Sequence, residues 1–418
     1  MKILFLADNF PPEKNAQASR VYERARYWVQ WGHDVTVVTC APNFPEGKVY
    51  PGYRNRWRQA ETRDGIRVVR VKTFIAANRG NVLRILDFLS FMLAAFVAGL
   101  AEPRPDVVVA TSPQFFAAVA GWALSKFKRR PFVMELSDLW PDSIVAVGAM
   151  RPNPALKLLE QVELFLYRHA AAIVALTHAF KRNLTGRGIQ PDKIDVVRNG
   201  VELSLFQPRP RDWQLAAEVG ISPGDFVLGY IGTLGMAHAL DKVLDAAGQF
   251  AGSNVKFMLL GPGAERESLI EEAQRRRLDN VLILPAQPKE RMPAFWSLCD
   301  VALVHLKNTP LFKTVIPSKL FEAMGMGLPV LLAAPAGEAS EIVVKEGVGI
   351  WIPPEDPSAL AAAAERLRSD ADLRTGLADA SRAAACRHTR ESQAREMLDS
   401  LSAVVKSPQP LPELLAMK

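Results

Sequence analysis

The stretch from Thr309 to Leu332 reads TPLFKTVIPSKLFEAMGMGLPVLL and predicts, in order, a loop, a helix, a glycine-rich turn and a buried strand. Pro317 suits the first turn of a helix, where its missing N–H is no loss, and Ser318 is a favourable residue at a helix start. The turn MGMG closes the helix, and the apolar run after it begins a strand. The stretch is therefore predicted to be one helix-to-strand unit of an α/β fold.

The start of this helix has the chemistry to bind a nucleotide-sugar. A helix N-terminus presents unpaired N–H groups and a partial positive charge, which suit phosphate, and Lys319 adds a cation in the first turn. Glu322 lies one turn further on, on the same face as Ser318 and Lys319, so it can hold a diol while the helix start holds a diphosphate. The same spacing also fits a capped helix with a surface ion pair between Lys319 and Glu322, and the residues alone leave both interpretations open.

The rest of the chain repeats this α/β pattern. It has 418 residues, 49% of them hydrophobic and 23% charged, which is enough for two or three globular domains. Seven continuous apolar runs between residues 2 and 200, and six more between 225 and 354, predict parallel strands separated by helices. We therefore predict two doubly wound, Rossmann-like α/β domains that face a central cleft. The expected boundaries are 1–202 for the first domain, 203–213 for a linker, 214–385 for the second domain, and 386–418 for a final helix that packs back on the first domain, with a loose tail.

Several classes of protein are not indicated. The three cysteines lie far apart without metal-type spacing, so we expect neither a disulfide framework nor a metal site. The glycines that follow strands form neither a G-x-G-x-x-G fingerprint nor a P-loop, so an ordinary NAD domain or an ATPase is not indicated and no cofactor is expected. No nucleic-acid-binding module is recognised.

The first half of the chain is basic and carries a long apolar segment. Residues 1–200 contain 28 Lys and Arg against 17 Asp and Glu, and ten of these basic residues lie between positions 48 and 84, with Tyr50, Tyr53 and Trp57 among them. Residues 88–100, FLSFMLAAFVAGL, carry no charge but are too few to span a bilayer. They fit either a buried helix or an interfacial helix beside a polybasic surface, and the basic neighbourhood favours membrane contact through residues 48–100. The N-terminus resembles a first strand and not a signal peptide, so we expect a cytoplasmic protein, peripheral on the cytoplasmic face of the inner membrane.

Seven segments, in this order, resemble the GT-B glycosyltransferases of the retaining family 4, and within it the WbuB-like amino-sugar transferases of O-antigen and exopolysaccharide assembly. These segments are FLADNFPPEKNAQASR (5–20), SDLWPDS (137–143), RNGVELSLF (198–206), YIGTLGMAHALDKVLDAA (230–247), LLGPGAER (259–266), LPAQPKERMPAFWSLCDVALVHL (284–306) and FKTVIPSKLFEAMGMGLPV (312–330).

The resemblance implies a nucleotide-diphospho-sugar donor, UDP-linked, on the second domain and an acceptor on the first. Glu322 would hold the ribose, the helix start and the glycine turn after the second domain's first strand would hold the diphosphate, and the 284–288 loop would meet the base. The implied donor-binding residues are Gly232, Thr233, Gly235, Gly261, Pro285, Lys313, Pro317, Ser318, Lys319, Leu320 and Glu322. The implied acceptor-side residues are Asn9, Phe10, Gln17, Asp138 and His178, and the implied catalytic residues are Asp138, Lys319 and Glu322.

Two positions depart from the family pattern. Thr314 stands where the first of two paired glutamates is usual, and Thr233 and His238 occupy the region of the usual arginine and lysine. Lys313 or Lys319 would have to take over their contacts with the diphosphate.

The function implied by the resemblance is a retaining, metal-independent transfer of an N-acetylated or deoxyamino hexose to a polyprenyl-diphosphate-linked saccharide. In such a reaction the departing phosphate takes the acceptor's proton, and catalysis depends on positioning and on stabilising the leaving charge. A UDP-sugar epimerase of the same fold and a non-catalytic nucleotide-sugar-binding protein are the alternatives.

Overall fold

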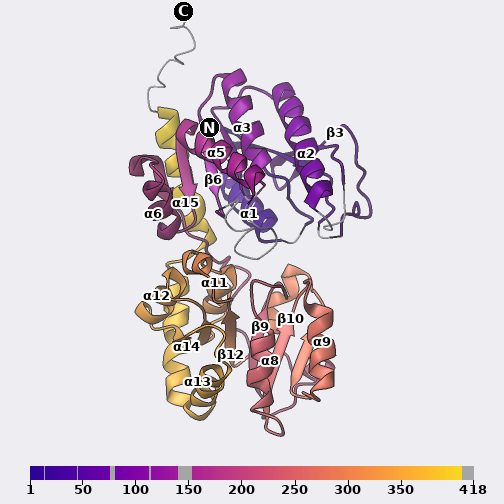
Figure 1. The fold of residues 1–418 in the computed structure, drawn as a ribbon, viewed down its shortest axis with the longest axis vertical. Helices are drawn as coiled ribbons and strands as arrows, with labels where there is room; N and C mark the ends of the chain where they lie inside the picture. The colour runs from indigo at the N-terminus through magenta and orange to yellow at the C-terminus, as the bar shows by residue number, and fades with distance from the viewer. Residues whose placement is uncertain (14, 45, 76–80, 113, 140–152, 407–418) are drawn as a thin grey trace, which may run out of the picture.

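The computed structural model describes residues 1–418 apart from positions 14, 45, 76–80, 113, 140–152 and 407–418. Figure 1 shows two α/β domains, one above the other, each with its own sheet and with helices around it. The predicted pair of Rossmann-like domains with parallel sheets is confirmed.

The first domain is built on an eight-stranded sheet with the order β3-β4-β2-β1-β5-β6-β7-β8. All neighbouring strands are parallel except β3 and β4, which are antiparallel. The sequence analysis did not predict β3, because its sequence RQAETR is as polar as a loop. The strands β5, β6 and β7 are buried along their whole length, as continuous apolar runs require. The elements are β1 (Lys2–Leu6), α1 (Ala16–Gln30), β2 (Asp34–Cys40), β3 (Arg58–Arg63), β4 (Ile66–Val71), α2 (Asn81–Ala101), β5 (Val107–Thr111), α3 (Phe115–Lys128), β6 (Phe132–Leu136), α5 (Pro154–His169), β7 (Ala172–Ala175), α6 (His178–Gly186), η1 (Pro191–Lys193) and β8 (Ile194–Val196).

The second domain is built on a six-stranded, fully parallel sheet with the order β11-β10-β9-β12-β13-β14. Its six strands coincide with the six apolar runs of the second half of the sequence. The elements are α7 (Trp213–Glu218), β9 (Phe226–Ile231), α8 (Asp241–Gly248), β10 (Val255–Leu260), α9 (Arg266–Arg275), β11 (Val281–Leu284), η2 (Lys289–Arg291), α10 (Met292–Trp296), β12 (Val301–His305), η3 (Pro310–Thr314), α11 (Ser318–Gly325), β13 (Val330–Ala333), α12 (Glu338–Lys345), β14 (Gly349–Ile352), α13 (Pro357–Ser369), α14 (Ala371–Ala385) and α15 (Arg390–Lys406).

The chain crosses between the domains twice, once after β8 and once before α15, and the two crossings lie side by side. Val201 and Thr389 form a parallel bridge, and a Cβ on Gly200 would lie 2.6 Å from the carbonyl oxygen of Thr389, so only glycine permits this approach. Beyond the second crossing, α15 packs on α1, where the Trp28 indole N–H donates a 2.8 Å hydrogen bond to the carbonyl of Ala394. Figure 1 shows α15, in yellow, running from the second domain along the first. We call the paired crossings the hinge.

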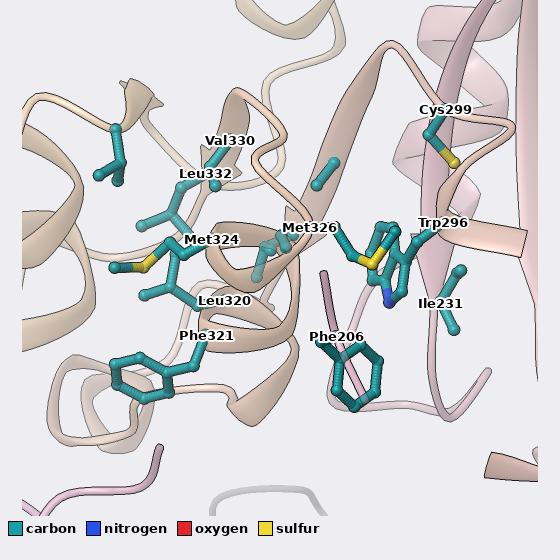
Figure 2. Packing of buried hydrophobic residues seen from close by; sticks show 14 of the residues in the cluster. Phe206, Ile231, Trp296, Cys299, Leu320, Phe321, Met324, Met326, Val330 and Leu332 are labelled. Carbon is teal, nitrogen blue, oxygen red and sulfur yellow. The ribbon is translucent and has the colours of Figure 1, made fainter. Parts of the chain in front are cut away.

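The helix of the opening stretch, α11, is held by the core of the second domain. Figure 2 shows Leu320, Phe321 and Met324 among the packed apolar side chains, and all three are fully buried. Each such side chain stabilises the fold by about 1.5–3 kcal/mol. Gly325 lies against the hinge, because a Cβ there would come within 2.9 Å of a Val201 methyl group. The start of α11 is therefore fixed relative to both the second sheet and the hinge.

Candidate functional site

The ammonium group of Lys319, in the first turn of α11, is buried and has no hydrogen-bond partner among the residues that the structure describes. Its Nζ lies 3.3 Å from the ring centroid of Tyr230, at the end of β9. Burial lowers the pKa of Lys319 well below its usual value, and the charge of Glu322 opposes this shift only in part. A buried ammonium costs several kcal/mol unless an anion pairs with it. The site is therefore suited to an anionic ligand.

The turn after β9 closes over this ammonium. Gly232 has a φ of 149°, and a Cβ there would lie 2.7 Å from Nζ of Lys319, so only glycine fits. Gly261, which has a φ of 150°, supports the turn from behind, because a Cβ there would overlap the carbonyl oxygen of Gly232. Gly235 is not crowded in this way, and Thr233 is exposed. The site thus brings Gly232 and Lys319 together, and Gly261 contacts the turn instead of facing the cleft.

The helix start differs from the prediction by one residue. α11 begins at Ser318, and Pro317 is the extended cap residue before it, with φ −63° and ψ 131°. The carbonyl of Pro317 accepts a 3.1 Å hydrogen bond from the Leu320 N–H, which is the bond that a cap residue accepts. The N–H groups of Ser318 and Lys319, which come before Leu320 in the first turn, have no partner within the helix and remain available to a phosphate, whereas Pro317 has no N–H and contributes only as the cap residue.

Glu322 is partly buried at the boundary between the domains. Burial raises its pKa, nearby Lys289 and Arg390 lower it, and Glu23 of α1 raises it. Glu23 forms ion pairs with both Lys289 and Arg390, the latter at 2.8 Å, so these cations are already paired. No ion pair joins Lys319 and Glu322 within the described part of the chain, and Lys319 is not on the surface, so the alternative of a surface ion pair is wrong. The Glu322 carboxylate can accept hydrogen bonds from a diol.

His238 does not replace the cations missing from the family pattern. Nδ1 of His238 lies 3.2 Å from the carbonyl oxygen of His305. In return, Nδ1 of His305 lies 2.7 Å from the carbonyl oxygen of His238. Burial, and then the charge of Lys319, lower the pKa of His238 to about 3. Both imidazoles are tied to the backbone, and His238 is neutral at physiological pH.

The remaining predicted donor residues lie around this centre in different ways. Pro285 is exposed directly after β11, and Lys313 is exposed on η3. The hydroxyl of Thr314 donates a 2.6 Å hydrogen bond to the carbonyl of Leu311 and stays within its own turn. Leu320 was predicted to contact the donor, but its side chain packs in the core and its N–H already donates to the carbonyl of Pro317.

The acceptor-side predictions do not form one cluster. Gln17, in the first turn of α1, donates a 2.8 Å hydrogen bond to Asp8, and Asn9, in the loop between β1 and α1, accepts one from Asn15. Phe10 is fully buried with its ring edge-on to Tyr22, so its prediction as an acceptor contact is wrong: an aromatic side chain in a motif can serve the core.

The other two acceptor-side residues lie apart from this loop. Asp138 follows β6, and its carbonyl oxygen lies 3.4 Å from the Ser112 hydroxyl. The second aspartate of the same motif, Asp142, falls outside the described residues. His178 is exposed at the start of α6 and lies beside the hinge, next to Lys181 and Arg182.

Two functional candidates escaped the sequence analysis. Burial raises the pKa of Asp8, directly after β1, to about 6, although a hydrogen bond from Gln17 opposes this. Burial and the charge of Asp8 raise the pKa of Asp87, on α2, to about 7. These carboxyl groups lie at the carboxyl end of the first sheet, where α/β folds bind ligands. The position of Asp8 at the end of the first strand was the available signal, whereas only the tertiary structure brings Asp87 to it.

Comparison with known proteins agrees with this architecture. Residues 15–200 match the family described as glycosyl transferase 4-like domain, and residues 212–384 match glycosyl transferases group 1. Among curated proteins, a putative colanic acid biosynthesis glycosyl transferase of Escherichia coli K12, WcaI, is 24% identical over 374 residues, which cover 87% of this chain and 91% of the relative.

Solved structures share the fold at low identity. Sucrose-phosphate synthase of Thermosynechococcus elongatus superposes with a TM-score of 0.78 at 18% identity and covers 96% of this chain and 98% of its own. Anabaena HepE in complex with UDP-glucose superposes with a TM-score of 0.72 at 20% identity and covers 96% of this chain and 100% of its own. The chain therefore belongs to the family 4 glycosyltransferases of GT-B fold, in which a glycosyl transferase 4-like domain precedes a group 1 domain.

Proposed function

We propose that the protein transfers an N-acetylated or deoxyamino hexose from a UDP-linked donor to a polyprenyl-diphosphate-linked saccharide, with retention, during surface polysaccharide assembly. The observation that carries the donor half is the buried ammonium of Lys319 at the start of α11, beneath the Gly232 turn, which has no hydrogen-bond partner in the part of the chain that the structure describes. The name of the E. coli relative, which places that protein in colanic acid biosynthesis, supports the polysaccharide half.

In this proposal, the residues of the site promote sugar transfer by stabilising charge and by positioning the substrates. The bond from the sugar's anomeric carbon to the diphosphate breaks while the acceptor oxygen bonds to the same face of that carbon. The departing phosphate oxygen takes the acceptor's proton. Lys319 and the first N–H groups of α11 stabilise the charge that develops on the leaving diphosphate, an effect worth about 10²–10³ in rate for one such donor. Glu322 holds the ribose, and Asp138 orients the acceptor hydroxyl. No metal or other cofactor takes part in this proposal.

An exposed apolar face on α2 supports a lipid-linked acceptor. Within this helix, Leu83–Ala101 has a mean hydropathy of 1.9, and 22% of its most apolar window is buried. The segment is longer than the thirteen apolar residues expected from the sequence and is long enough to cross a bilayer by length and composition. However, Phe91, Ala95 and Ala98 pack in the core of the first domain, which fixes the helix along the domain surface.

The opposite side of α2 is open to solvent. Leu93 is 62% exposed and Val97 65% exposed, and the neighbouring Phe127 of α3 is 71% exposed. Trp57, which is 79% exposed, has the ammonium of Lys72 4.7 Å from its ring centroid. An apolar helix face beside basic and aromatic residues matches the interfacial region of an anionic membrane. These observations support our proposal that the enzyme binds the cytoplasmic face of the inner membrane.

The test is nucleotide release from a panel of UDP-, GDP- and dTDP-sugars, with and without an undecaprenyl-diphosphate-linked saccharide. We expect release with one UDP-sugar only when the lipid acceptor is present. An epimerised donor formed without the lipid would identify the isomerase instead. A chain that neither consumes any donor nor gains thermal stability with UDP would leave the non-catalytic alternative.

A further inference from the structure

Two adjoining hollows lie beside the hinge, and together we call them the hinge groove. One has a volume of about 340 Å³ and is lined by His178, Lys181, Arg182 and Thr185, which share one face of α6. The other has a volume of about 220 Å³ and shares His178. Its remaining wall comes from both crossings of the chain and from α15, and includes Arg198, Asn199, Arg387, His388, Gln393 and Glu396.

Cations dominate the wall of the hinge groove. Among the described residues, four lysine and arginine side chains and one acidic side chain, that of Glu396, line it. Arg198 and Arg182 form ion pairs with Glu338 over long distances of 3.4 and 3.9 Å. Nε of Arg198 is buried and has no hydrogen-bond partner among the described residues. A guanidinium has five N–H donors, so the wall retains unused donors for an anion.

The chemistry of the wall indicates the kind of anion. Apart from imidazoles, no aromatic ring lines the groove within the described part of the chain, so it offers no stacking surface for a nucleobase or sugar ring. Arginine forks beside the hydroxyls of Thr185 and Ser392 match the geometry of phosphate oxygens. We infer that the hinge groove binds a small phosphate-bearing anion, at a site separate from Lys319 and Glu322.

Such an anion would act on the junction between the domains. The carboxylates that now pair with the groove's arginines come from the two ends of α12: Glu338 with Arg198, and Glu346 with Arg387 at 2.7 Å. Glu338 also accepts a hydrogen bond from the Ala179 N–H at the start of α6, so it ties the second domain to the first. An anion bound to the arginines competes with both carboxylates, and it therefore favours a different angle between the domains.

Pyrophosphate is the probe for the test. Titration calorimetry should show two bound pyrophosphates on the wild-type protein, one at the donor site and one in the hinge groove. The Lys319→Met variant should retain one of them, with a similar affinity in the presence and absence of UDP. Combining Lys319→Met with Arg198→Gln and Arg387→Gln should weaken this remaining site at least tenfold. Arg209→Gln, which removes an exposed arginine of the linker, is the matched control.

Three results decide the inference. Loss of all pyrophosphate binding in Lys319→Met would overturn it, as would unchanged binding in the combined variant. Arg182 is 70% exposed, so Arg182→Gln serves as a second groove variant that should weaken binding without affecting the fold. Small-angle scattering of Lys319→Met should change on adding pyrophosphate, and identical curves would refute the competition with α12. A failure of the donor site would appear as absent UDP binding and a single pyrophosphate on the wild-type protein, while Lys319→Met would still bind one pyrophosphate in the hinge groove, so the two proposals fail separately.

Discussion

Replacing Lys319 by methionine should change ligand binding and apoprotein stability in opposite directions. The substitution keeps the length of the side chain and removes the ammonium that lies buried beneath the Gly232 turn. If Lys319 pairs with a diphosphate, its charge destabilises the free protein and stabilises the complex. A lysine with a purely structural role would stabilise the free protein instead.

The buried environment of Lys319 sets the size of both expected changes, in the free energy of unfolding and in the affinity for UDP. An isolated buried charge costs several kcal/mol, and the contact with the Tyr230 ring offsets only about 0.5–2 kcal/mol of this. We therefore expect Lys319→Met to leave the free energy of unfolding unchanged or to raise it by about 1–4 kcal/mol. A hydrogen bond to a charged group contributes about 1.5–3 kcal/mol, so the dissociation constant of UDP should rise roughly 10- to 150-fold.

Urea unfolding of the ligand-free protein and calorimetric titration with UDP measure the two effects. Lys242→Met is the matched control, because this lysine is partly exposed and pairs with Asp241 and Asp245 on the surface of the second domain. It should leave the UDP affinity unchanged. A Lys319→Met protein that binds UDP like the wild type and unfolds more easily would refute the assignment.

The same residue predicts a pH dependence. The pKa of Lys319 in the folded, free protein lies well below its usual value of 10.5. At pH values between the folded-state pKa and 10.5, the unfolded chain binds more protons than the folded protein, so the free energy of unfolding rises with pH. A bound diphosphate favours the ammonium form and raises this pKa. UDP binding should therefore take up a proton in the same window and weaken as pH rises through it. Calorimetry in buffers of different ionisation enthalpy measures the uptake, which Lys319→Met should abolish.

Three further substitutions test other parts of the structure. Gly232→Ala should weaken UDP binding at least tenfold because its φ of 149° and the nearby ammonium exclude a Cβ, whereas Gly235→Ala should bind normally; equal affinities would contradict this. Glu135→Gln should cost about 3–5 kcal/mol in urea unfolding at pH 7, because it leaves two buried arginines unpaired. Burial raises the pKa of Glu135, but the two arginines lower it more, so that the pKa falls from 4.5 to about 2. The contribution of this carboxylate to the free energy of unfolding should therefore be lost as pH falls between these values, and an unfolding free energy that does not change with pH there would refute the pairing. Val97→Glu should abolish co-sedimentation with anionic phospholipid vesicles while Val344→Glu, at a 60% exposed position of α12, retains it; equal retention would exclude α2 as the docking face.

The sequence predicted the fold well because buried parallel strands leave a local signal. Mainly apolar runs identified every parallel strand, since strands in the middle of a parallel sheet are buried on both faces. β3 was missed because an edge strand with one exposed face can carry charges. The start of α11 was displaced by one residue because proline fits both the cap and the first helical position.

The site was less predictable because its contacts join distant parts of the chain. The spacing predicted Lys319 as a phosphate ligand, but its burial against the Tyr230 ring depends on a contact between α11 and a residue of β9 far away in the sequence. Phe10 and Leu320 belong to motifs, yet motif membership does not say which way a side chain points. The raised pKa of Asp87 arises only when α2 lies against the end of β1.

The most direct test of the central claim is the mass of a polyprenyl-diphosphate-linked saccharide after incubation with the protein and the UDP-sugar that the donor panel identifies. We predict that the lipid gains the mass of one sugar, that NMR shows the new linkage with the anomeric configuration of the donor, and that Lys319→Met slows its formation by at least two orders of magnitude. An acceptor of unchanged mass while the donor is consumed, or a Lys319→Met protein as fast as the wild type, would contradict the account.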